Sequence, residues 1–126
     1  MQKFGIFALA LGFVALPARS FADPVIIGAN VFNDTAFNAT SLSILSASTN
    51  TAGAVIKTMI VGCNSSVTVY AQSPSGVQVD LLYCQGSPSS GAATLPSPVY
   101  LPPGWLLALA NSSTATAGIN MSYDLQ

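Results

Sequence analysis

The stretch that decides the fold is VTVYAQSPSGVQVDLLYC, residues 67–84. Two segments, residues 67–72 and 77–84, alternate apolar and polar side chains, which is typical of half-buried strands. Between them lies SPSG, in which Pro suits the second position of a tight turn and Gly the fourth. The stretch therefore predicts a β-hairpin.

Alternation also divides the hairpin into two faces. Val67, Val69 and Ala71 share one face of the first strand, and we expect them in the core. On the second strand the odd-numbered residues are the more apolar set. The even-numbered set, with Asp80 and Cys84, is expected on the wetter face. In the preceding segment, residues 54–63, alternation places Lys57 and Cys63 on that same wetter face.

Cys63 and Cys84 are the only cysteines, and in an oxidising compartment such a pair forms one structural disulfide. A redox or metal pair is the alternative, but CxxC spacing and His ligands are absent. In a three-stranded meander the outer strands lie about 9.5 Å apart, whereas a disulfide needs Cα atoms within about 7 Å. We therefore expect the chain to bend, or to change sheet, near one cysteine.

The rest of the chain predicts further short strands and no helical segment longer than a turn. Strands are expected at residues 25–32, 41–46, 54–63, 99–101, 106–110 and 116–125, with a short one at 92–95 inside a loop rich in Ser, Gly and Pro over 85–98. Residues 102–105, PPGW, suit a type II turn. About seven or eight strands predict one all-β domain, an antiparallel β-sandwich or a jelly-roll-like fold.

The first 22 residues predict a secretory signal peptide. Lys3 precedes an apolar run over residues 4–16, and Ser20 and Ala22 place small residues at a cleavage site. The run is shorter than the roughly 20 residues of a membrane-spanning helix, although an uncleaved anchor is the alternative. Cleavage leaves one domain, residues 23–126, without a membrane span, and we expect it in the periplasm or outside the cell.

Charge is scarce in that domain. Its ionisable side chains, apart from Tyr and Cys, are Lys57, Asp23, Asp34, Asp80 and Asp124. A net charge of −3 excludes the basic patch of a nucleic-acid-binding protein. The only base available to a serine hydrolase is Lys57, and the GxSxG motif is absent. We therefore expect neither catalysis nor a cofactor.

Oxygen ligands cluster near the start of the domain, at Asp23, Asn30, Asn33 and Asp34. Their spacing matches no calcium-binding loop, and Asn and Asp are common turn residues. We expect no metal site.

Five Asn-x-Ser/Thr triplets occur, at Asn33, Asn38, Asn64, Asn111 and Asn120. They are glycosylation acceptors only in a eukaryotic secretory pathway. A chain rich in Asn, Ser and Thr also produces such triplets by chance.

Tyr70, Tyr100 and Trp105 are the candidate contact residues. Together they could form a flat patch that stacks on sugars or on a protein partner. The alternative is that Trp105, which follows a turn, plugs one end of the sandwich.

The stretches NTAGAVIKTMIVGCNSS, VTVYAQSPSG and VYLPPGWLLALANSS, with a closing alternating strand, resemble small all-β domains of tailed-phage virion accessory proteins in their order of strands and turns. The resemblance covers residues 51–126. It implies a structural role through trimer or particle contacts, whereas the signal peptide and the disulfide depart from that pattern.

Together these features predict an exported, non-enzymatic structural or interaction domain. It would act by self-association as a homo-oligomer, or by binding a protein or glycan surface. One alternative is a carbohydrate-binding module that uses the three aromatic residues. Another is a pilin-like subunit, suggested by the strand at residues 118–125, whose incomplete sandwich a neighbour's strand would fill.

Overall fold

The structure, a computed structural model, describes residues 26–37, 40–86, 90–112 and 116–126, so the predicted signal peptide lies outside the described residues. The described residues contain nine strands and no helix. The strands are β1 Asn30–Phe37, β2 Ser41–Leu45, β3 Ala54–Cys63, β4 Val67–Gln72, β5 Gln78–Cys84, β6 Gly91–Thr94, β7 Val99–Leu101, β8 Leu106–Asn111 and β9 Ala117–Leu125. The all-β prediction is confirmed.

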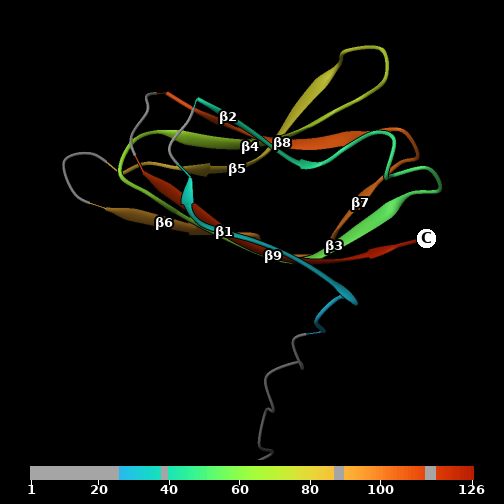
Figure 1. The fold of residues 1–126 in the computed structure, drawn as a ribbon, viewed down its shortest axis with the longest axis horizontal. Coiled ribbons are helices and arrows are strands. Elements are labelled where there is room, and N and C mark those ends of the chain that lie inside the picture. Colours follow the sequence, from blue (N-terminus) through green and yellow to red (C-terminus); the bar gives the residue numbers. More distant parts are fainter. Residues whose placement is uncertain (1–25, 38–39, 87–89, 113–115) are drawn as a thin grey trace, which may run out of the picture.

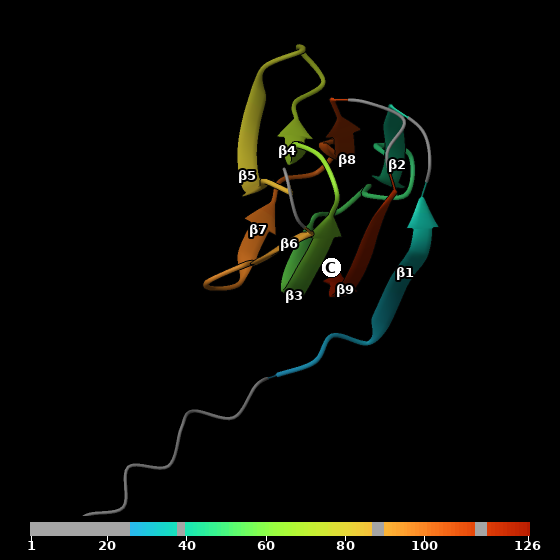
Figure 2. The same cartoon turned by 90° about the vertical axis from the view of Figure 1, so that its left-hand side faces the viewer.

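The strands form two antiparallel sheets that face each other in a sandwich-like arrangement (Figure 1). Sheet I has the order β1-β9-β3-β6, and β7 also pairs with β3. Sheet II has the order β2-β8-β4-β5, and Figure 2 shows its four strands above those of sheet I. The largest fully buried apolar side chains are Ile56, Met59, Leu101, Leu107, Leu109 and Met121, which come from both sheets.

Most strands follow the predicted pattern, and β3 and β4 have the predicted bounds. The clearest difference is the first strand, predicted at residues 25–32 and observed at Asn30–Phe37. Its pairing with β9 begins only at Asn30, opposite Tyr123. The short strand inside the Ser- and Pro-rich loop is present as β6, which brings the described strands to nine.

Both predicted turns are confirmed. In the hairpin, the Gly76 N–H donates to the Ser73 carbonyl at 2.9 Å. After β7, the Trp105 N–H donates to the Pro102 carbonyl at 3.2 Å, and Gly104 has φ of +76°. A positive φ at the third residue defines a type II turn and favours Gly there.

The predicted faces of β5 are wrong after the register irregularity at Leu81, whereas before it Val79 pairs with buried Ala71 and Asp80 is exposed opposite Tyr70, as predicted. Val67 pairs with Cys84 and Val69 with Leu82, and both valines are buried, so the even-numbered partners point into the core. Tyr83, expected inside, is exposed. Alternation separates two sets of side chains, but only the register with the neighbouring strand decides which set faces inward.

The disulfide joins the two sheets. Cys63 ends β3 in sheet I, Cys84 ends β5 in sheet II, and their Cα atoms lie 6.2 Å apart. The expected change of sheet is therefore confirmed: it occurs across residues 64–66, and β4 pairs with β8 and β5 rather than with β3. The two cysteines are 3% and 2% exposed, so their expected place on the wetter face is wrong.

Replacing both cysteines by serine should lower the free energy of unfolding by about 3 kcal/mol, because the closed loop no longer restricts the unfolded chain. Urea unfolding of the oxidised protein and of the Cys63→Ser/Cys84→Ser variant measures the difference. A reducing agent should destabilise only the wild type. Equal stability of the two proteins would contradict a structural role.

Candidate functional site

The candidate site is the outer face of sheet I, the side turned away from sheet II. Strand register and burial place on it Val31 and Asn33 of β1, Val55, Thr58, Ile60 and Gly62 of β3, Tyr100 of β7, and Gly118, Asn120, Ser122 and Asp124 of β9. Ile60 is 53% exposed and Tyr100 is 55% exposed. Large apolar side chains are thus presented to solvent on an ordered strand surface.

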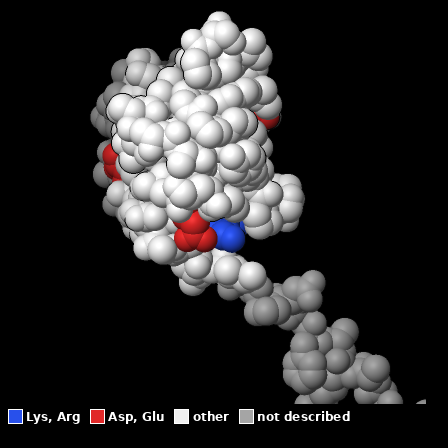
Figure 3. All heavy atoms as spheres, turned by 90° about the vertical axis from the view of Figure 1, so that its right-hand side faces the viewer, with Lys and Arg blue, Asp and Glu red and all other residues white. Residues whose placement is uncertain are grey.

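The main charges beside this face form one pair. Lys57 lies at an irregularity in β3, where the pairing with β9 skips it, and its Nζ is 3.6 Å from Asp124 Oδ2. Figure 3, which views the domain from the side, shows the blue atoms directly beside red ones. Because the two charges offset each other, this face is close to electrically neutral.

Residues 26–29, here named the strap, lie against the outer face of sheet I before β1 begins. The Gly28 N–H donates to Ser122 Oγ at 3.1 Å, and the Ala29 N–H donates to Asp124 Oδ1 at 2.6 Å. Ser122 Oγ also bonds the Thr58 hydroxyl at 2.7 Å. One buried hydroxyl and one carboxylate therefore connect the strap to both β9 and β3.

Gly28 is required by this close approach. A Cβ at this position would lie 2.5–2.6 Å from the backbone of Tyr123, nearer than side-chain carbons come to other atoms. No other residue type can take this position without moving the strap.

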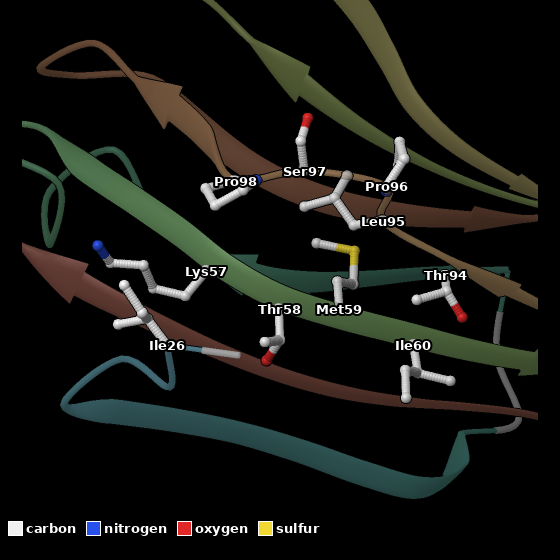
Figure 4. Close-up of a pocket in the computed structure, with 10 residues that line it drawn as sticks. All are labelled: Ile26, Lys57, Thr58, Met59, Ile60, Thr94, Leu95, Pro96, Ser97 and Pro98. Carbon is white, nitrogen blue, oxygen red and sulfur yellow. The ribbon is translucent and has the colours of Figure 1, made fainter. Parts of the chain in front are cut away.

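A groove of about 600 Å³ opens beside β3. The segment between β6 and β7 forms one wall, the strap contributes to the other, and β3 forms the floor (Figure 4). Its lining residues are Ile26, Lys57, Thr58, Met59, Ile60, Thr94, Leu95, Pro96, Ser97 and Pro98. Apart from the ammonium group and three hydroxyls, the side-chain lining is apolar.

A second, shallower hollow of about 240 Å³ adjoins the groove and shares Ile60 with it. It lies over Gly62 and Gly118, which pair with each other on β3 and β9. Two facing glycines leave no side chain above the sheet, so the depression follows directly from the sequence. Asn33 and Asn120 border it.

The structure separates the three predicted contact aromatics. Tyr70 pairs with Ala108 and lies on the outer face of sheet II, whereas Tyr100 pairs with Val55 on the outer face of sheet I. Trp105 is half-buried in the loop before β8 and packs against the core. Tyr70 and Tyr100 therefore do not share one flat patch.

Other candidate residues also point in different directions. Asn33 and Asp34 are neighbours on β1, so their side chains alternate between faces. Within the described residues, no group of three or more His, Cys, Asp or Glu side chains could hold a metal ion. Of the glycosylation triplets, Asn33, Asn64 and Asn120 are exposed, Asn111 is buried, and Asn38 lies outside the described residues.

Sequence reasoning missed the strap, the Lys57–Asp124 pair, the groove and the hollow. The ion pair connects residues far apart in the chain, and no local pattern reports such a contact. Gly28, Gly62 and Gly118 were the available signal, because Gly inside a strand pattern often marks a close backbone approach.

Comparison of this chain with protein-family models, with curated proteins and with solved structures found no match. In the described part of the chain, no helix has the length and apolarity to cross a membrane. The geometry of the outer face of sheet I is therefore the basis for a functional proposal.

Gly28→Ala should release the strap, because the new Cβ would overlap the Tyr123 backbone. Loss of the bond from Ala29 to the Asp124 carboxylate should speed amide exchange at Ala29 by about tenfold, the equivalent of one charge-assisted hydrogen bond. Hydrogen exchange followed by NMR measures this rate.

Gly62→Ala is the matched control, since a Cβ there would meet its nearest neighbour at 4.0 Å. It should leave the Ala29 exchange rate unchanged. Unchanged exchange in Gly28→Ala as well would contradict the described position of the strap.

Proposed function

We propose that this protein is an exported, non-enzymatic contact domain that associates with further copies of itself through the outer face of sheet I. The observation that carries the proposal is the combination of exposed Ile60 and Tyr100 with near-neutral charge on an ordered strand surface. Burying such a surface removes apolar area from water and requires little desolvation of charge.

A non-enzymatic role is supported by what surrounds Lys57, the one Lys or Arg among the described residues. The Lys57 ammonium lies beside Asp124, and the nearby hydroxyls of Thr58 and Ser122 bond to each other. These groups form a structural network that holds the strap. The proposal therefore assigns them to folding rather than to proton transfer.

Export is supported by the disulfide. Disulfides form and persist mainly in oxidising compartments, and Cys63–Cys84 joins the two sheets inside the core. This agrees with the leader-like first 22 residues and with a periplasmic or extracellular location.

Size-exclusion chromatography with light scattering over a range of protein concentrations tests self-association. The wild type should form dimers or larger oligomers. Ile60→Asp should raise the dissociation constant about tenfold or more, because it replaces a large buried apolar contact by a charge.

Val79→Asp is the matched control, since Val79 is similarly exposed but belongs to sheet II. It should associate like the wild type. A monomeric wild type at every concentration, or equal weakening by both substitutions, would overturn the proposal.

Carbohydrate binding is the second candidate function, and Tyr100 is the observation that favours it. Its exposed ring packs against Gly53, and the Tyr100 hydroxyl occupies the space that a side chain at position 53 would need. An aromatic ring held in one orientation is a suitable platform for stacking on a sugar.

On a glycan array, binding by the wild type should disappear in Tyr100→Ala and persist in Tyr70→Ala, which changes the opposite face. An array without any bound glycan would remove this candidate.

Two further alternatives have less support. In a pilin-like subunit a neighbour's strand would complete the sandwich, whereas here the core positions of both sheets are filled by the described strands themselves. The resemblance to virion accessory domains stays a prediction, as do the trimer or particle contacts that it implies.

A further inference from the structure

The groove beside β3 and the hollow over Gly62 and Gly118 lie one after the other along β3 and are here together named the channel. Ile60 lines both. Lys57 lies at one end, and Ile60 and Thr94 lie toward the other (Figure 4). From Lys57 to Gly62 the strand advances on the order of 16 Å, five residues at about 3.3 Å each. The channel thus follows β3, with the Lys57 ammonium at one end and the hollow at the other.

The walls of this channel suit an alkyl chain. Ile26 and Ile60 are exposed on one side, and Pro96 and Pro98 present carbon atoms on the other. Beyond Ile60, the paired glycines leave space where side chains would otherwise stand. Water in such a channel is displaced favourably by hydrocarbon.

The Lys57 ammonium has capacity for a further anionic partner. Its 3.6 Å separation from Asp124 Oδ2 exceeds the usual N–H···O hydrogen-bond distance of about 3.2 Å, and an ammonium carries three donors. The side chain is 23% exposed. As the only cation after residue 22, Lys57 is where a ligand anion would find its opposite charge.

We propose that this channel binds a free, unbranched alkyl carboxylate, with its head group on Lys57 and its chain running along β3 over Ile60 toward Gly62. Because Asp124 already offsets the Lys57 charge, every further negative charge at this end adds repulsion, so a monoanionic carboxylate fits better than a dianionic phosphate. This binding site goes beyond the proposed self-association and does not depend on it.

Isothermal titration calorimetry with dodecanoate, below its micelle concentration and at a protein concentration where light scattering reports monomer, tests the site. Wild type should bind dodecanoate about tenfold more tightly than 1-dodecanol, the difference made by one charge-assisted hydrogen bond. In Lys57→Met this preference should vanish while binding of the alcohol remains.

The double variant Lys57→Met/Asp80→Asn restores the net charge of the wild type and should bind dodecanoate as weakly as Lys57→Met. Recovery of tight binding in the double variant would mean that overall charge, rather than the site, attracts the ligand, and would overturn the proposal. Absence of dodecanoate binding by the wild type, or equal affinity for the alcohol, would overturn it too.

Gly62→Leu tests the path of the chain. Because a Cβ at Gly62 would meet its nearest neighbour only at 4.0 Å, the variant should fold, and circular dichroism checks this. The leucine should fill the hollow and weaken the binding of dodecanoate about tenfold, because several of its methylene groups lose their contacts. The shorter octanoate should bind as before. If the substitution weakened the binding of dodecanoate and octanoate equally, or weakened neither, the alkyl chain would not run over Gly62, and the proposal would be overturned.

Discussion

The rest of the structure depends on the passage of the chain from one sheet to the other at the end of β3. Cys63 closes β3, the strand of sheet I that pairs with β9, β6 and β7, and its disulfide reaches Cys84 on the edge strand of sheet II. The centre of one layer is thereby tied to the border of the other. Since β3 also forms the floor of the groove, the position of the candidate site is set by the same connection that holds the layers together.

Much of the fold could be predicted because its strands alternate and its turns carry Pro and Gly. The change of sheet was predictable for a different reason: the spacing of strands in a meander is incompatible with the reach of a disulfide. The orientation of β5 was not predictable, because an extra residue at Leu81 and the register with β4 decide it. The strap was missed because Gly28 and Tyr123, which are in contact, lie near opposite ends of the domain's sequence.

The candidate site could be predicted only in its general character. Scarcity of charge indicated a contact role rather than catalysis, and Tyr100 was one of the three candidate contact residues. Composition could not show that Lys57 and Asp124 come together, or that Asp124 then fixes the strap. A single carboxylate thus serves two purposes: it balances the Lys57 ammonium and it fixes the direction in which the chain enters the domain. The network is small, and the surface around it carries little further charge.

The segment between β6 and β7 has a consequence for how the domain behaves at high concentration. Together β6 and β7 make one border of sheet I, and Pro96 and Pro98 lie between them. Proline has no N–H to offer an incoming strand, and sheet borders interrupted in this way resist pairing with other chains. A continuous ladder of hydrogen bonds cannot cross this border. Fibre-like polymerisation from this side is therefore blocked, even though the chain is rich in β-structure and poor in the charges that usually keep such proteins apart.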